Sequence, residues 1–187
     1  AQMTGDTRVR SFLGVRILVA FSLTIWTTYA AIYLTDSAGL GLAEATISLL
    51  PMVTALVTMA LILLAARRMR AAWTFSNLSW GLIGWLLAGF CFVVAPSQAL
   101  LLAVVWAALS AAGRALFQPA SQSYWANIVG DHERAQVFAV SAALMALATV
   151  PAGPLAGLLY TLSPRSPFVL AMALQVTALV WIRRLEL

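Results

Sequence analysis

Arg114 is an ionisable residue in the middle of apolar sequence, and polar residues recur on one side of a helix built through it. They are Ser110, Gln118, Ser121 and Gln122, with Tyr124 and Trp125 at the end of the stripe. Placing an arginine at the centre of a membrane costs about 2.5 to 3.5 kcal/mol on insertion scales. We therefore expect the stripe to face a cavity or another helix. Either it forms a solute or gating position, or Arg114 bonds to carbonyls beside Pro119 or extends to the membrane surface.

A second stripe follows the first apolar run, where side chains with polar tips recur at helical spacing. They are Ser22, Trp26, Tyr29 and Tyr33. Such aromatic residues line many solute pathways because they offer an apolar face and a hydrogen-bonding group together, although ordinary helix packing gives the same pattern. Isolated polar residues such as Asn77 and Gln175 more often form interhelical hydrogen bonds than bind ligands. The candidate pathway residues are Arg114, Gln118, Gln122, Trp26, Tyr29, Tyr33 and Asn77.

Prolines and glycines gather in the fifth apolar run, at Pro151, Gly153, Pro154 and Gly157. Proline removes hydrogen bonds from a helix, and glycine lets a neighbouring backbone approach closely. We expect a bent, tightly packed helix here, and we take these four residues with Pro119 as candidates for helix kinks or gating. A small-residue contact with no mechanical role is the alternative.

Residues for enzyme chemistry are scarce. The single cysteine, Cys91, lies in an apolar run, and the single histidine, His132, lies between acids in a predicted loop. No metal site, cofactor site or catalytic group is expected, and we do not expect an enzyme. No carboxylate lies inside a predicted span, so a protonation site for proton-driven transport would have to be elsewhere.

The elements that position these residues are predicted to be membrane helices. Of 187 residues, 63% are hydrophobic and 9% are charged, and the mean hydropathy of +0.94 indicates a lipid environment. Uncharged runs of about 20 residues can cross a membrane as helices. We predict an all-α integral membrane protein whose residues 1–187 form one six-helix bundle. The predicted spans are residues 14–35, 45–66, 72–94, 98–128, 135–160 and 167–182, and residues 1–10 are a cytoplasmic linker or tail.

The arginines predict how the bundle is oriented. They fall in short clusters before the first span, between the second and third, between the fourth and fifth, and after the sixth, whereas Arg165 is on the opposite side. Positive residues in short loops stay on the cytoplasmic side, so both termini are predicted to be cytoplasmic in a multi-pass protein of the inner (plasma) membrane. The net charge of +5 does not indicate nucleic-acid binding, because the arginines form no continuous basic face.

Two segments then suggest a family. The fourth span reads GRALFQPASQSYWANIVGDHERAQ, with an arginine inside the helix, a proline break and the turn DHER. Helix five is similar to an antiporter motif in Gly153, Pro154 and Gly157, although Thr149 and Leu158 replace its first and last glycines. With six spans, the chain resembles one half of a transporter of the major facilitator superfamily, built as a three-plus-three repeat. The reduced loop between the second and third spans makes it more like the carboxy-terminal half, and the non-methionine start agrees with a fragment.

The resemblance implies a function and partners. We expect a small solute to cross the inner membrane by alternating access, with efflux favoured over uptake and an anionic or zwitterionic solute favoured by Arg114. The expected partners are membrane lipid, the solute, and a second six-helix half, which is a missing amino-terminal half or a second copy of this chain. The alternative is a scaffold or truncated half that packs with a partner and transports nothing.

Overall fold

The structure is a computed structural model that describes residues 7–66, 74–129 and 134–186. All regular structure in these ranges is helical. The helices are α1 (Thr7–Thr35), α2 (Glu44–Ile47), α3 (Leu50–Ala66), α4 (Thr74–Val94), α5 (Leu100–Ile128), α6 (Arg134–Thr149), α7 (Ala152–Leu162) and α8 (Ser166–Glu186). Within the described ranges, six helical stretches are long and apolar enough to cross a membrane. The predictions of an all-α fold and of six such stretches are confirmed.

Two of the helices extend further than the sequence predicted. Helix α1 begins at Thr7 rather than at residue 14, so Arg8 and Arg10 lie on the helix instead of before it. Helix α8 continues to Glu186, past the predicted end at residue 182. Arginine is a good helix former and its long side chain carries the charge away from the axis, so a charged residue need not end a helix. Arg67, Arg68, Arg70 and His132 lie outside the described residues.

The fifth predicted span is divided into α6 and α7 at Pro151. Proline has no N–H, so Pro151 and Pro154 cannot bond to the carbonyls four residues earlier. The N–H of Val150 instead bonds to the carbonyl of Leu147 at 3.3 Å, and the regular pattern resumes where Leu155 bonds to Pro151 at 3.0 Å. Pro119 behaves differently, since α5 continues as one helix on both sides of it.

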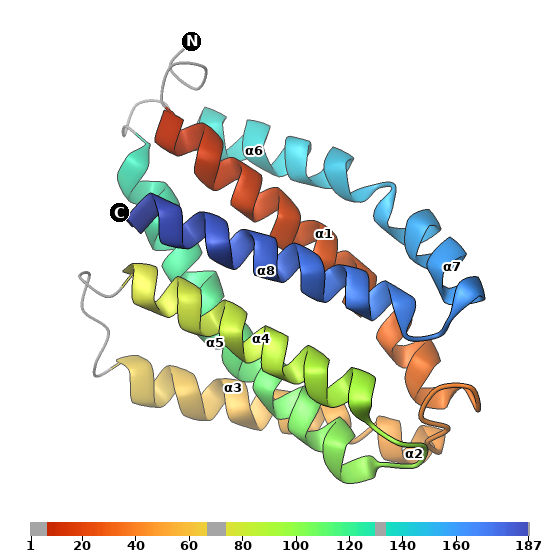
Figure 1. The fold of residues 1–187 in the computed structure, drawn as a ribbon. Helices are drawn as coiled ribbons and strands as arrows, with labels where there is room; N and C mark the ends of the chain where they lie inside the picture. Colours follow the sequence, from red (N-terminus) through yellow and green to blue (C-terminus); the bar gives the residue numbers. More distant parts are fainter. Residues whose placement is uncertain (1–6, 67–73, 130–133, 187) are drawn as a thin grey trace.

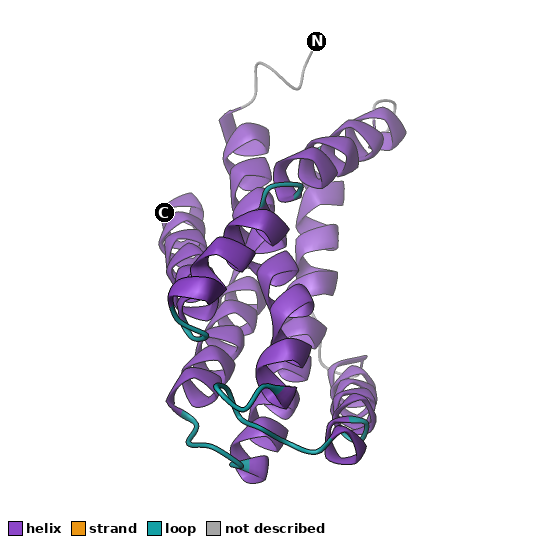
Figure 2. Cartoon of the chain, turned by 90° about the vertical axis from the view of Figure 1, so that its right-hand side faces the viewer, coloured by secondary structure: helices purple, strands orange, loops and turns teal. Residues whose placement is uncertain are grey.

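The helices form a bundle in which α8 joins two groups (Figure 1). Helix α1 packs on α6, α7 and α8, while α5 packs on α3 and α4, and α8 also contacts α4. Helix α1 begins and α8 ends at one end of the bundle, which we call the terminal end. The connections after α1, α4 and α7 lie at the opposite loop end, which faces the viewer in Figure 2.

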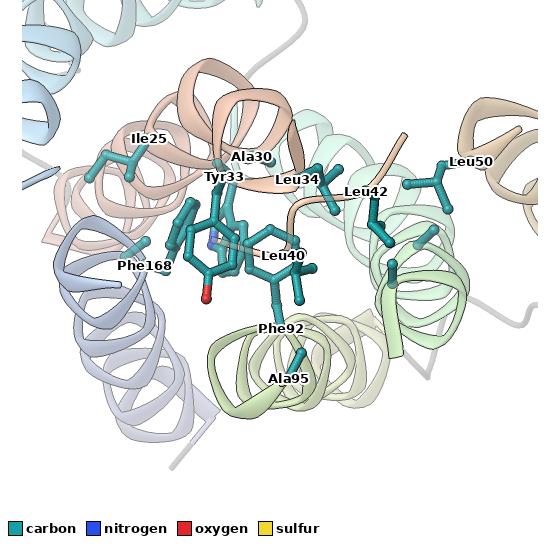
Figure 3. Close-up of a cluster of buried hydrophobic side chains, with 14 of the residues drawn as sticks. Ile25, Ala30, Tyr33, Leu34, Leu40, Leu42, Leu50, Phe92, Ala95 and Phe168 are labelled. Carbon is teal, nitrogen blue, oxygen red and sulfur yellow. The ribbon is translucent and has the colours of Figure 1, made fainter. Parts of the chain in front are cut away.

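Two apolar clusters form the core, one toward each end. The loop-end cluster contains interlocking rings, and Tyr33, Phe92 and Phe168 point toward one another between α1, α4 and α8 (Figure 3). Their centroids lie 4.9 to 5.2 Å apart. The terminal-end cluster surrounds Phe12 and Trp125. At the loop end, backbone bonds from Leu40 to Tyr33 and from Gln98 to Leu40 join the connections to the helices. The core thus fixes α1, α4 and α8 firmly.

Candidate functional site

Arg114 lies at the midpoint of α5. The helix spans Leu100–Ile128, so fourteen residues lie on either side (114 − 100 = 14 and 128 − 114 = 14). At about 1.5 Å per residue, each end of the helix is about 21 Å away. The side chain is exposed, and Arg114 forms no hydrogen bond or ion pair with another described residue. The structure therefore gives no support to a bond with carbonyls beside Pro119.

A large cavity borders Arg114 on the loop-end side. We call this space of about 510 Å³ between α1, α3 and α5 the apolar cavity. Most of its walls are apolar: Leu23, Trp26, Ala30, Ala31, Leu34, Ile47, Leu50, Pro51, Ala55, Trp85, Trp106, Ala107 and Ala111. Its polar wall residues are Thr27, Thr54, Ser110, Arg114 and Gln175. The size and lining are typical of small-molecule pockets.

A second cavity borders Arg114 toward the terminal end. It measures about 310 Å³, and we call it the polar cavity. Its polar walls are Arg16, Thr27, Arg114, Gln118, Ser121 and Gln122. Leu23, Thr27, Trp85 and Arg114 line both cavities, so the two spaces adjoin. A third space of about 320 Å³ between α3 and α5 is also lined by Arg114, Gln118 and Gln122. The part of the predicted stripe from Ser110 to Gln122 therefore faces open space. The stripe's end does not, because Trp125 is buried in the terminal-end cluster and Tyr124 packs against it.

Arg16 is a site residue that the sequence analysis missed, because it was assigned to the cytoplasmic flank of the first span. Its guanidinium carbon lies 5.2 Å from the centroid of the Trp125 ring, close enough for a cation–π contact. Its Nη1 atom is buried, with no hydrogen-bond partner among the residues that the structure describes. The spacing of the arginines gave no sign that Arg16 and Arg114 would line one cavity, since they are on different helices.

The aromatic stripe of the first span divides between cavity and core. Trp26 lines the apolar cavity. Tyr29 instead donates a hydrogen bond of 3.3 Å to the carbonyl oxygen of Gly153, on α7. Tyr33 is only 1% exposed, in the loop-end core, and lines none of the three cavities. Asn77 also lines none of them. The structure thus brings Trp26, Arg114, Gln118 and Gln122 together around the cavities.

The two glycines of the fifth run differ in how closely they are packed. A Cβ atom at Gly153 would meet nothing within 4 Å, whereas one at Gly157 would lie 2.6 Å from the hydroxyl oxygen of Tyr29, which is a side-chain contact. On α4 and α5, by contrast, a Cβ atom at Gly113 would lie 2.7 Å from the carbonyl oxygen of Gly81. The tight helix pair that carries Arg114 is therefore α4 with α5, and the pair was missed because its glycines are far apart in the sequence.

A buried polar pair lies beside the apolar cavity. Gln175 is 1% exposed, and its Nε2 donates a hydrogen bond of 2.9 Å to Oγ of Ser22, which provides the predicted interhelical bond. Its Oε1 is buried without a hydrogen-bond partner among the described residues. Gln175 also lines the apolar cavity, so this buried amide lies beside that space.

A polar network closes the loop end. The hydroxyl of Tyr160 donates to Oδ2 of Asp36 at 2.7 Å, and Nε of Arg165 donates to the hydroxyl of Tyr33 at 3.3 Å. The backbone N–H of Ala38 also donates to Asp36 at 3.0 Å. These bonds from Ala38 and Tyr160 stabilise the charged carboxylate and hold the pKa of Asp36 below its ordinary value. The network ties the end of α7 to the connection after α1.

The acids whose side chains the structure describes lie away from the cavities. They are Asp36 and Glu44, and neither lines any of the three cavities. The described ranges also contain no group of His, Cys, Asp or Glu residues that could hold a metal ion. The charged side chains in the cavity walls, among the described residues, are Arg16 and Arg114, and the chemistry that two guanidinium groups offer is binding of oxyanions.

The chain matches no model of a known protein family, and no curated protein matches it significantly.

Proposed function

We propose that this chain is one six-helix half of a major facilitator-type secondary transporter, which moves a small anionic solute across the inner membrane by alternating access. Efflux is the favoured direction, and both termini are cytoplasmic. The observation that carries the proposal is the position of Arg114 at the midpoint of α5, where it bonds to no other described residue and borders three adjoining spaces. A charge retained at that depth without a partner among the described residues has a functional explanation, because it is costly for the fold alone.

The cavities also suit a site that alternates between two sides. The apolar cavity extends from Arg114 toward the loop end and the polar cavity toward the terminal end. A solute held at Arg114 is therefore near the middle of the bundle, where transporters of this kind bind their substrates. The division of α6 from α7 at Pro151 supplies a point at which the fifth span bends.

A second six-helix half, or a second copy of the chain, is part of the proposal. Helices α3 and α6 lie on opposite edges of the bundle (Figure 1), and both carry exposed apolar side chains such as Leu56, Met59, Leu144 and Leu147. Lipid covers such faces as readily as protein does, but the cavities between α1, α3 and α5 need a second wall. Rocking of the two halves then exposes the site to either side.

Transport by membrane vesicles tests the proposal with any natural partner half in place. Inside-out and right-side-out vesicles from cells that produce the chain are compared with vesicles from cells lacking its gene. The labelled probes are benzenesulfonate, glucose and benzyltrimethylammonium, which differ in charge. We expect uptake of benzenesulfonate into the inside-out vesicles above the gene-deleted background.

Matched variants make the transport test specific. Arg114→Ala is expected to abolish the benzenesulfonate signal. Arg10→Ala is the control, because Arg10 is exposed on α1 and lines none of the three cavities. Transport of no probe by either vesicle type would contradict the proposal and favour a scaffold.

A further inference from the structure

The charge balance of the two adjoining cavities is unusual for the interior of a helix bundle. Arg16 and Arg114 both line the polar cavity, and neither Asp36 nor Glu44 lines it. Two like charges that line one cavity repel each other, and an anion between them offsets that repulsion. The other polar side chains of the wall are neutral, namely Thr27, Gln118, Ser121 and Gln122. Among the side chains that the structure describes, the charge of this wall is positive only, which favours an anionic ligand.

The two guanidinium groups approach this space from different helices and at different levels. Arg16 is 19 residues before the end of α1 at Thr35, and Arg114 is 14 residues after the start of α5 at Leu100 (35 − 16 = 19 and 114 − 100 = 14). With both of those helix ends at the loop end, the two residues differ in depth by about 8 Å at about 1.5 Å per residue. An oxyanion between the two residues can offer one oxygen atom to the guanidinium group of Arg16 and another to that of Arg114. Nη1 of Arg16 forms no hydrogen bond with another described residue, so this part of its hydrogen-bonding capacity is not used within the bundle.

The apolar cavity supplies a different kind of surface next to this charge. Trp26 and Trp106 lie there with ring centroids 6.1 Å apart, and Trp85 lines both cavities. Nε1 of Trp85 already donates to the carbonyl of Ser110 at 3.0 Å, so its ring offers mainly an apolar face. Such walls favour a flat apolar or aromatic group.

We infer that the adjoining cavities bind an amphipathic organic anion, with its oxyanion between Arg16 and Arg114 and its apolar body among Trp26, Trp85 and Trp106. This inference rests on the proposed function and names its substrate class. The shared chemistry is an oxyanion on an apolar body, which a free aromatic sulfonate or carboxylate and an anionic lipid both have. We assign the site to the free solute, because the apolar cavity has a limited volume of about 510 Å³.

Equilibrium binding tests the inference independently of transport. The purified full chain, with any second half that copurifies, is placed in nanodiscs of neutral phosphatidylcholine and titrated with labelled benzenesulfonate. We expect benzenesulfonate to bind saturably. Inorganic sulfate should compete with an affinity at least about tenfold weaker than that of benzenesulfonate, and benzyltrimethylammonium should not compete. Equal competition by sulfate would contradict a role for the apolar cavity.

Substitutions at both arginines test the oxyanion position. Arg16→Gln and Arg114→Gln are each expected to weaken binding by about tenfold to a hundredfold, since each removes a charge-assisted contact. Arg16→Lys keeps the charge and should retain most of the binding. Arg10→Gln, on the same helix but away from the cavities, should leave it unchanged. Unchanged binding by Arg16→Gln would overturn the two-arginine site.

Lipid competition separates the two sources of the oxyanion. Nanodiscs containing anionic phosphatidylglycerol are expected to bind benzenesulfonate as the neutral discs do. Loss of binding in those discs would assign the cavities to a lipid headgroup and overturn the solute class. If benzenesulfonate fails to bind while the vesicles transport another anion, the substrate class is wrong and the proposed transport function stands.

Discussion

Gly113 on α5 faces Gly81 on α4 so closely that a Cβ atom added at Gly113 would lie 2.7 Å from the Gly81 carbonyl oxygen. The added atom would also lie 2.9 Å from Cδ1 of Trp85, which lines both the apolar and the polar cavity. Since the obstacle is backbone, the helices must move apart to admit a methyl group. This contact sets where Arg114, one residue further along α5, is placed.

Gly113→Ala should therefore destabilise the bundle by about 1 to 3 kcal/mol. The measurement is the unfolding midpoint in a sodium dodecyl sulfate titration. Gly153→Ala is the matched control, because a Cβ atom there meets nothing within 4 Å, and it should leave the midpoint unchanged. Equal midpoints for both variants would show that α4 and α5 are not packed as described.

The buried pair of Ser22 and Gln175 predicts a non-additive result. Ser22→Ala removes the acceptor for Nε2 of Gln175, which is then buried without a partner, and should cost about 1 to 3 kcal/mol. Adding Gln175→Leu removes the stranded amide and should recover most of that loss. The same titration measures the stability of the single and double variants. If the double variant loses as much stability as the two single variants lose together, the pairing is contradicted.

The loop-end network predicts a dependence on acidic pH. The pKa of Asp36 is lowered by the bond from Ala38 and the bond from Tyr160, so its contribution to stability is complete above the ordinary aspartate pKa of about 3.9. That contribution is lost as pH falls through the lowered pKa. When the pH is lowered from 7 to below the pKa of Asp36, the melting temperature of the wild type should fall further than that of Asp36→Asn. The same loss in both proteins would exclude Asp36 as the cause.

Arg114 is expected to matter for function and little for folding. Because it has no bond to another described residue, Arg114→Leu should keep or raise the unfolding midpoint while abolishing benzenesulfonate transport. Vesicle uptake and the detergent titration measure the two effects on the same preparation. A large loss of stability would instead indicate a structural role.

The sequence predicted the helices well because hydrophobic length is a local property. The uncharged runs gave six spans, and the prolines at 151 and 154 explain the division of α6 from α7. The ends were less predictable, since Arg8 and Arg10 were taken to precede the first helix although α1 includes them.

The candidate site was only partly predictable because helical periodicity does not say which face meets which partner. Ser22, Trp26, Tyr29 and Tyr33 share a stripe, yet Trp26 lines a cavity while Tyr33 lies in the core. Arg16 was missed, since its proximity to the cavity of Arg114 depends on how α1 packs beside α5. The pathway roles of Tyr29, Tyr33 and Asn77, and the gating roles of Pro119, Pro151, Gly153, Pro154 and Gly157, stay predictions.

Water access at position 114 tests the central claim most directly. In a Cys91→Ser background, Arg114→Cys is compared with Val176→Cys in membranes treated with the impermeant reagent 2-(trimethylammonium)ethyl methanethiosulfonate. Val176 is the matched control, because it is the midpoint of α8, is exposed, and lines none of the three cavities. The reagent attacks the thiolate, which forms only where water reaches the sulfur. A water-accessible cavity predicts modification at position 114 at least about tenfold faster than at position 176, and equally slow modification at both positions would contradict it.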